Sequence, residues 1–343
     1  MIPSEGIGTL TKRIIGLLFA TWSVLGLVMG TGCDSSRSKD LSSRSADRLT
    51  VGTIGADLSS LIWVAKGRGY FTEQGVDVDV KLYESGHLAL QDLFAGKLDL
   101  ATASEFAAVR YGLERTDIRI ISVLDVAQDQ ELVARKDRGI TRPSELRGKR
   151  IGVACNSSAE YYLDLLLLLE KMRHEDVRIV DLLPSQQIKA LTQGDIDAIM
   201  VWEPFATMAK KELGTNAVSW PGQSGQDEYW LLLGTQGTIE KRSDMIRRFL
   251  AALDSAEAFI KTDSNRAMGI VAKELEQRHL EWSWKNHRFV LGLHRPLVLK
   301  MEAELKWLGS APGARQSNVP DVYELIYFDA LRSVAKEKVR MIE

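Results

Sequence analysis

Short apolar runs alternate with segments of helical periodicity along most of this chain. The run Ile196–Val201 is almost wholly apolar and predicts a strand buried on both faces, as in parallel sheets. Just before it, Ile188 and Leu191 are spaced as on one helix face, and Gly194 suits the left-handed residue that ends a helix. Further strands are expected at 49–54, 76–83, 118–124, 130–135, 177–183 and 229–235. This alternation of strands and helices predicts an α/β protein.

One helix–glycine–strand unit occurs twice, with a constant offset of 98 residues. The segments ALQDLFAGKLDLATASEF and IKALTQGDIDAIMVWEPF align without a gap, so that Gly96 corresponds to Gly194 and Glu105 to Glu203. Ligands of open α/β sheets bind outside the carboxyl ends of the strands. Two such units therefore predict two lobes with a cleft between them. Chance repetition, which any βαβ protein can produce, is the alternative.

Composition limits the possible functions. The chain has 343 residues, a formal net charge of −2 and 45% hydrophobic residues, which suits one large or two medium globular domains. Near-neutral charge gives no reason to expect nucleic acid as a partner. Two cysteines, Cys33 and Cys155, leave no disulfide framework or CxxC site, and the five histidines form no HExxH pairing. We therefore expect no metal and no other cofactor.

The N-terminal region predicts export. Two basic residues precede an uncharged apolar run at 14–30, which is typical of a secretory signal or of an uncleaved anchor helix. Small residues then lead to Cys33, so that residues 1–33 resemble a bacterial lipoprotein signal with Cys33 as the lipid attachment site. That resemblance implies retention on the inner membrane, because Asp34 follows. Residues 34–48 are rich in serine and predict a flexible tether.

Polar residues at the expected strand ends and helix starts are the candidate ligand contacts. Helix starts near Ser59 and Ser157 expose amide groups that favour an anionic group of a ligand. Because the carboxyl ends of strands border the binding site, the candidates are Asp57, Gly86, His87, Ser104, Glu105, Asp125, Asn156, Ser157, Ser158, Trp202 and Glu203.

Several candidates also have structural explanations. Asp57 is a possible helix N-cap, and Glu203 with Pro204 suits the first turn of a helix. Trp202 offers either a stacking surface or core packing. Glu105 and Glu203 in one cleft attract an amine, whereas the helix starts attract an acid group. The expected ligand is therefore a zwitterion or an amino-heterocycle rather than nitrate or sulfate.

Four segments in order carry a family resemblance: WVAKGRGYFTEQGVDVDV, ALQDLFAGKLDLA, PSELRGKRIGV and ALTQGDIDAIMVWEP. They resemble the periplasmic substrate-binding proteins of ABC importers in the nitrate, sulfonate, taurine and thiamine-pyrimidine class. The resemblance runs from about Leu49 to Thr262.

The resemblance implies a two-lobed, type II periplasmic-binding-protein fold with a ligand cleft and a hinge of two chain crossings. On this basis lobe I is expected at 49–135 and 235–343, and lobe II at 136–234. The implied protein is a monomeric, membrane-tethered, extracytoplasmic component that captures a small solute for an ABC permease and its ATPase, and it is not an enzyme.

Two alternatives remain. One is an accessory lipoprotein that senses a ligand and acts through a partner. The other is an enzyme, since a fungal relative of this fold makes the thiamine pyrimidine with a cysteine-rich loop and iron. The single internal cysteine, Cys155, does not match that loop.

Overall fold

The computed structural model describes residues 48–276, 283–310 and 321–341, which belong to one compact unit. The expected signal at 1–33, its lipid-attachment residue Cys33 and the tether at 34–48 lie outside the described residues, apart from Arg48. Within the described ranges, no helix combines the length and the apolar character needed to cross a membrane.

A seven-stranded sheet forms the first lobe (lobe I). Its strands, in spatial order, are β12 (Val339–Arg340), β11 (His287–His294), β4 (Ile118–Ala127), β10 (Glu228–Thr235), β3 (Leu100–Ser104), β1 (Arg48–Ile54) and β2 (Asp77–Tyr83). β1 pairs in parallel with β2 and β3, whereas β10 runs antiparallel to both of its neighbours, β3 and β4. The interior strand β3 is buried along its whole length, as its apolar sequence predicts.

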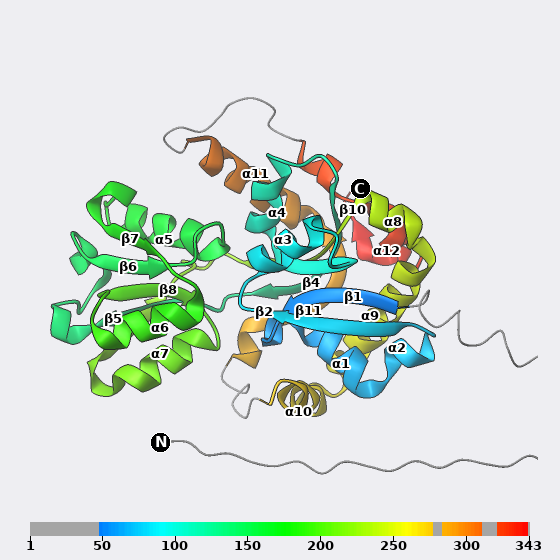
Figure 1. Cartoon of the computed structure of the whole chain (residues 1–343), viewed down its shortest axis with the longest axis horizontal. Helices are drawn as coiled ribbons and strands as arrows, with labels where there is room; N and C mark the ends of the chain where they lie inside the picture. The colour runs from blue at the N-terminus through cyan, green and yellow to red at the C-terminus, as the bar shows by residue number, and fades with distance from the viewer. Residues whose placement is uncertain (1–47, 277–282, 311–320, 342–343) are drawn as a thin grey trace, which may run out of the picture. The chain divides into compact units, whose positions relative to one another are not determined.

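A five-stranded sheet forms the second lobe (lobe II), drawn in green in Figure 1. Its strands, in spatial order, are β7 (Arg178–Asp181), β6 (Arg150–Val153), β8 (Ala198–Trp202), β5 (Gln130–Arg135) and β9 (Ala217–Pro221). β6 pairs in parallel with β7 and β8, and β5 runs antiparallel to β8 and β9. In the five-stranded sheet only β5 runs against the other strands, whereas in the seven-stranded sheet β10, β11 and β12 run opposite to β1, β2, β3 and β4.

The chain passes between the sheets twice, from β4 to β5 and from β9 to β10, which confirms the expected two-crossing hinge. The strand memberships correct the expected lobe boundaries. Residues 130–135 were expected in lobe I but pair within the five-stranded sheet, and β10 was expected largely in lobe II but pairs within the seven-stranded sheet. The reason is that β5 and β10, the strands that follow the two crossings, pair with strands of the sheet that the chain has just entered.

Helices cover both sheets. In lobe II they are α5 (Ser158–Leu169), α6 (Pro184–Gln193) and α7 (Phe205–Leu213). In lobe I they are α1 (Ser60–Arg68), α2 (Tyr70–Glu73), α3 (Gly86–Phe94), α4 (Glu105–Gly112), α8 (Gln236–Lys241), α9 (Ser243–Thr262), α10 (Ser264–Glu274), α11 (Arg295–Ser310) and α12 (Phe328–Arg332). α1 packs against α9 and α10, and α11 packs against α4.

The duplicated unit has the same structure in both lobes. Gly96 and Gly194 end their helices with positive φ values of 71° and 83°. The side chain of the aspartate three residues after each glycine then accepts a hydrogen bond from the backbone of a neighbouring strand. Asp99 Oδ2 accepts a hydrogen bond from Thr50 N at 2.9 Å, and Asp197 Oδ2 accepts one from Arg150 N at 2.9 Å. The repeat is therefore structural.

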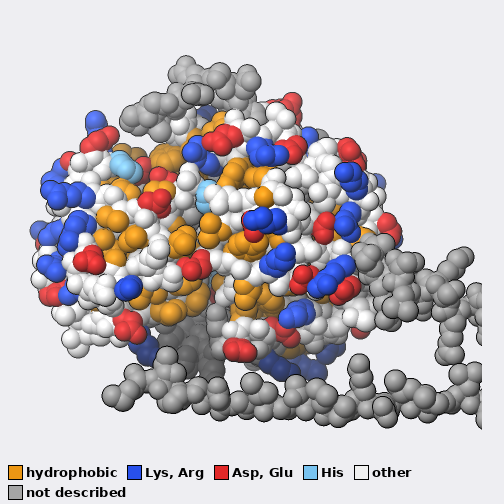
Figure 2. Space-filling view, in the orientation of Figure 1, with side chains coloured by type: hydrophobic (Ala, Val, Ile, Leu, Met, Phe, Trp, Pro, Cys, Tyr) orange, Lys and Arg blue, Asp and Glu red, His pale blue; other side chains and the backbone are white. Residues whose placement is uncertain are grey.

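Basic and acidic side chains are interspersed over the face shown in Figure 2. This mixture agrees with the net charge of −2 for the whole chain. No single-sign stripe of the kind that tracks a phosphate backbone is visible on that face.

Candidate functional site

A small cavity lies where the carboxyl ends of β1, β3 and β8 meet, between the two sheets. This is the location that open α/β sheets provide for ligands. Residues from both lobes line it: Ile54, Leu58, Gly86, His87, Ser104, Ala107, Ser157, Ser158, Trp202, Glu228 and Trp230. Six of the predicted ligand contacts are among them, namely Gly86, His87, Ser104, Ser157, Ser158 and Trp202.

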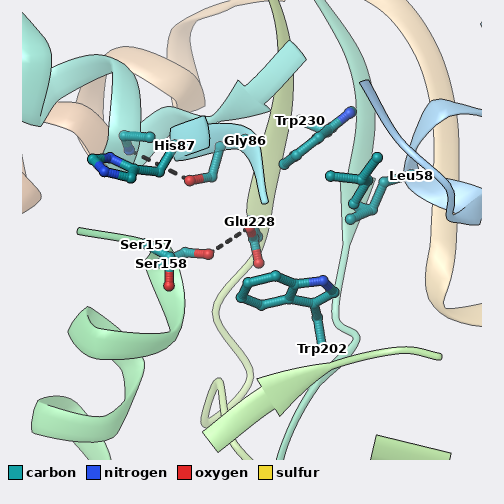
Figure 3. A pocket seen from close by; sticks show the side chains of 11 residues that line it. Leu58, Gly86, His87, Ser157, Ser158, Trp202, Glu228 and Trp230 are labelled. Carbon is teal, nitrogen blue, oxygen red and sulfur yellow. Dashed lines mark hydrogen bonds between the residues drawn. The ribbon is translucent and has the colours of Figure 1, made fainter. Parts of the chain in front are cut away.

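One side of the cavity is formed by helix starts (Figure 3). α3 begins at Gly86, α4 follows the cap residue Ser104, and α5 follows the cap residue Ser157. Gly86 has to be glycine, because a Cβ there would lie 2.6 Å from the Cα of Ala103. The Ser104 side chain caps α4, but α5 has no side-chain cap. The first amides of α5 are thus the uncapped helix start at the cavity.

Ser157 and Glu160 have the S-x-x-E spacing of a capping box, but they do not form one. Ser157 Oγ donates to the backbone oxygen of Ala154 at 2.6 Å instead of accepting from the helix. Glu160 Oε2 accepts a hydrogen bond from Asn156 N at 2.8 Å. This leaves the Ser157 hydroxyl at the edge of the cavity and the helix amides without a side-chain oxygen.

Aromatic and aliphatic side chains form the other side of the cavity. Trp202 ends β8 in lobe II, while Trp230 lies in β10 and Leu58 precedes α1 in lobe I (Figure 3). Trp230 Nε1 donates to Ser59 Oγ at 3.1 Å, which fixes its ring. Trp202 Nε1 is buried and has no hydrogen-bond partner among the described residues. It therefore is a free donor beside the cavity.

Glu228 is the acidic residue of the cavity wall, and the sequence interpretation missed it. It is the first residue of β10 and is 2% exposed. Ser158 Oγ donates to Glu228 Oε1 at 2.7 Å, and Gln130 Nε2 donates to Glu228 Oε2 at 2.8 Å. Glu228 directly precedes the predicted strand 229–235, and this position at a chain crossing could have indicated a residue of the ligand site. Burial raises the pKa of Glu228, while these two hydrogen bonds act in the opposite direction.

Asp57 and Asp125, both predicted ligand contacts, do not line the cavity. They hold a buried histidine between them instead: His287 Nε2 lies 3.1 Å from Asp57 Oδ2, and His287 Nδ1 lies 2.5 Å from Asp125 Oδ2. Burial acts to lower the pKa of His287, but the two carboxylates outweigh it and hold that pKa well above its usual value. Burial acts to raise the pKa of Asp57, but the charge of His287 lowers it overall. This Asp57–His287–Asp125 triad also corrects the expectation that Asp57 caps a helix.

Glu105 is fully buried at the start of α4 and also does not line the cavity. Its Oε2 accepts a hydrogen bond from Tyr229 N at 3.0 Å. Burial raises the pKa of Glu105 to about 8, although the charge of Lys300 acts against this rise. The physical reason for the correction is that the first residue of α4 points back towards β10, whereas the cap residue Ser104 reaches the cavity.

Glu203 is turned away from the cavity as well. Its Oε2 accepts from Thr207 N at 2.9 Å and its Oε1 accepts from Thr207 Oγ1 at 2.8 Å, so it serves the first turn of α7. Lys210 Nζ lies 3.6 Å from Glu203 Oε1. The sequence analysis also offered Glu203 as a residue of the first turn of a helix. Its contacts agree with that interpretation, although α7 itself begins at Phe205.

Asn156 lies at the junction of the lobes and not in the cavity lining. Its backbone has a positive φ of 62°, and its Oδ1 accepts a hydrogen bond from Arg110 Nε of α4 at 2.9 Å. The side chain thus joins lobe II to lobe I.

The cavity lining holds little positive charge. None of its described residues is a lysine or an arginine. Burial lowers the pKa of His87, so its ring is neutral near pH 7. Among the described residues there is also no cluster of three or more His, Cys, Asp or Glu side chains arranged to hold a metal ion.

Known proteins resemble the chain over most of its described length. Residues 59–267 match the family model described as NMT1/THI5 like. A putative aliphatic sulfonates-binding protein of Bacillus subtilis (strain 168) is 25% identical over 274 residues, which cover 77% of this chain and 80% of the relative.

Solved structures share the fold. The alkanesulfonate-binding protein SsuA from Xanthomonas axonopodis pv. citri, bound to MOPS, superposes with a TM-score of 0.72 at 17% identity, over 82% of this chain and 98% of that one. The desulfurization enzyme DszB superposes with a TM-score of 0.60 at 17% identity, over 85% and 99%. The chain therefore has the two-lobed periplasmic-binding-protein fold that its motifs predict.

Proposed function

Because this chain belongs to the NMT1/THI5-like family, we propose that it is the extracytoplasmic solute-binding component of an ABC importer. The observation that carries the proposal is the cavity at the strand ends, to which both lobes contribute residues. A solute held there by Ser158 and Trp202 of lobe II and by Gly86 and Trp230 of lobe I favours the closed arrangement of the lobes. Such a ligand-dependent closure is what a permease can recognise.

The proposed ligand is a small organic solute with an acid group, of the sulfonate or taurine type. The uncapped start of α5 supports an anionic group at that side of the cavity. Leu58, Trp202 and Trp230 support an organic portion, because they give the opposite side an apolar surface. A relative described as a putative aliphatic sulfonates-binding protein supports the same class.

The proposed cellular arrangement is a monomer tethered to the cell membrane through lipidated Cys33, next to its permease and ATPase. The lipoprotein-like signal supports this tether. Incorporation of labelled palmitate into the wild-type chain but not into Cys33→Ala tests it. Labelling of neither chain would contradict lipidation and favour an uncleaved anchor helix.

Thermal unfolding of the full-length chain in mild detergent tests the binding function. The panel contains taurine, alkanesulfonates, nitrate, bicarbonate, aminopyrimidines, amino acids and polyamines. A ligand at 100 times its dissociation constant adds about 2.7 kcal/mol to the free energy of unfolding, which raises the midpoint by a few degrees in a chain of this size. A rise with one compound class supports a binding protein. A flat panel contradicts binding of these solutes and favours the accessory-sensor alternative.

The enzyme alternative has a specific weakness in this chain. DszB shows that the fold also occurs in an enzyme. The described cysteine, Cys155, is a poor nucleophile, because burial and then the charges of Glu160 and Asp181 raise the pKa of its thiol to about 12. This supports the proposal that the chain binds its solute without converting it.

A further inference from the structure

The carboxylate of Glu228 is held in place by neutral groups only. Its two oxygens accept one hydrogen bond each, from Ser158 Oγ at 2.7 Å and from Gln130 Nε2 at 2.8 Å. Gln130 Nε2 also lies 3.1 Å from Ser158 Oγ, so the three side chains form a closed network. A carboxylate accepts about four hydrogen bonds, and these contacts fill two of them on a residue that lines the cavity.

No cation of the cavity lining balances this charge. The described lining residues include neither lysine nor arginine, and His87 is neutral near pH 7. The charge of Lys300 acts to lower the pKa of Glu228, but the Lys300 Nζ lies over the rings of Tyr161 and Tyr162, at 4.4 and 4.6 Å from their centroids. A buried carboxylate without a paired cation is costly.

We propose that Glu228 binds a cationic nitrogen group of the solute and so selects zwitterionic or amine-bearing solutes over simple anions. The inference rests on the proposed solute-binding function and names the feature that decides specificity. An ammonium group in the cavity supplies the missing positive charge and fills the open hydrogen-bonding places of Glu228. A simple sulfonate instead puts a second negative charge into the same small cavity, and like charges at short distance in a buried site repel strongly.

The geometry gives the solute an orientation. Glu228 points into the space between Ser158 and Trp202 (Figure 3). The uncapped start of α5 belongs to the same side as Ser158, whereas Trp202 and Trp230 carry the apolar surface. A short aminoalkyl acid therefore lies with its acid group at α5, its amine at Glu228 and its carbon chain against the tryptophans.

Isothermal titration calorimetry on the full-length chain in mild detergent tests the inference with matched pairs. Each pair is an amine-bearing solute and its amine-free counterpart, such as taurine and ethanesulfonate, or β-alanine and propionate. In the wild type, the amine-bearing member is expected to bind at least about 30-fold more tightly, which corresponds to a 2 kcal/mol charge contact. In Glu228→Gln this preference is expected to disappear.

The matched control is Asp227→Asn. Asp227 precedes Glu228 but faces outwards, where Gln128 Nε2 donates to it at 3.0 Å and Arg288 pairs with it at 2.9 Å. The preference for amines should persist in this variant. If Glu228→Gln fails to fold, Glu228→Asp is the second variant. It keeps the carboxylate but places it one methylene group further from the solute, so the preference for amines should be reduced but not lost.

Two results overturn the inference in distinguishable ways. Equal or tighter binding of the amine-free members by the wild type overturns the role of Glu228 and leaves the binding function intact. Binding of no member of any pair overturns the inference together with the proposed ligand class.

Discussion

The Asp57–His287–Asp125 triad and Glu228 are two buried acidic sites that differ in whether the protein supplies a cation to the carboxylates. In the Asp57–His287–Asp125 triad, two carboxylates share a histidine whose raised pKa keeps it positively charged. At the cavity, Glu228 accepts hydrogen bonds only from the neutral Ser158 and Gln130. Both sites are almost inaccessible to solvent.

On our proposal, this difference separates a structural site from a binding site. The carboxylates of the triad share a cation that the protein itself supplies, and this cation stabilises them without a ligand. A buried carboxylate that has neutral donors but no paired cation is stabilised by a proton or by a cation from outside. Acidic residues at strand ends are thus ambiguous until the partner of each one is known.

The largest expected effect comes from removing the cation of the triad. His287→Ala leaves Asp57 and Asp125 buried without their partner, and should lower the free energy of unfolding by about 3–5 kcal/mol. Chemical denaturation measures this loss. The control is His174→Ala, because His174 pairs with Asp164 at a half-exposed position and should change stability by less than about 0.5 kcal/mol. A loss below about 1 kcal/mol for His287→Ala would remove the distinction between the two sites.

The next effect concerns pH and a third buried acid, Glu105, whose pKa is raised to about 8 by burial. Between pH 4.5 and 8 the folded state keeps this proton and the unfolded state releases it, so stability falls as pH rises through this window. Glu105→Gln mimics the protonated form and should flatten the fall, by up to about 1.4 kcal/mol per pH unit.

Denaturation at several pH values from 5 to 8.5 measures this prediction. Wild type and Glu105→Gln should be similar in stability near pH 5, and the variant should be the more stable one at pH 8. Parallel curves would contradict the raised pKa. The surface variant Asp92→Asn is a suitable comparison, because that carboxyl has a lowered pKa, caused first by its hydrogen bond to Lys97.

The smallest effect is expected at Glu203, whose carboxylate is satisfied by Thr207. Glu203→Gln should cost about 1 kcal/mol of stability or less, because it weakens hydrogen bonds to a charged acceptor. The affinity for the solute identified by the thermal panel should stay within about twofold. A tenfold loss of affinity, measured by calorimetry, would return Glu203 to the ligand site that its sequence position suggested.

Much of the fold was predictable because it rests on local patterns. The apolar run before Trp202 became β8, and Gly194 ends α6 in the left-handed conformation. The repeat located Gly96 correctly as well, since Gly96 has the same conformation. Helix periodicity and glycine conformation are properties of a few neighbouring residues, and a sequence displays them directly.

The site was less predictable because its contacts join distant parts of the chain. Asp57 meets His287 across 230 positions of sequence, and no local pattern announces this pair. Glu105 and Glu203 occupy equivalent places in the repeat, yet one faces Tyr229 and the other Thr207. Glu228 reaches the cavity because β10 enters the sheet at that residue. Side-chain partners of this kind follow from tertiary packing.

The position of Glu228 beside a chain crossing has a consequence for the order of events during capture. Glu228 begins β10 and Gln130 begins β5, so both follow directly on the two connections about which the lobes turn. Residues near a pivot move least during a rotation. Under the proposed function, an arriving solute therefore meets Glu228 and Gln130 in nearly the same mutual position in the open protein as in the closed one. Under the same proposal, closure acts on a solute that already contacts this pair, and the rate of reopening sets how long the solute is kept.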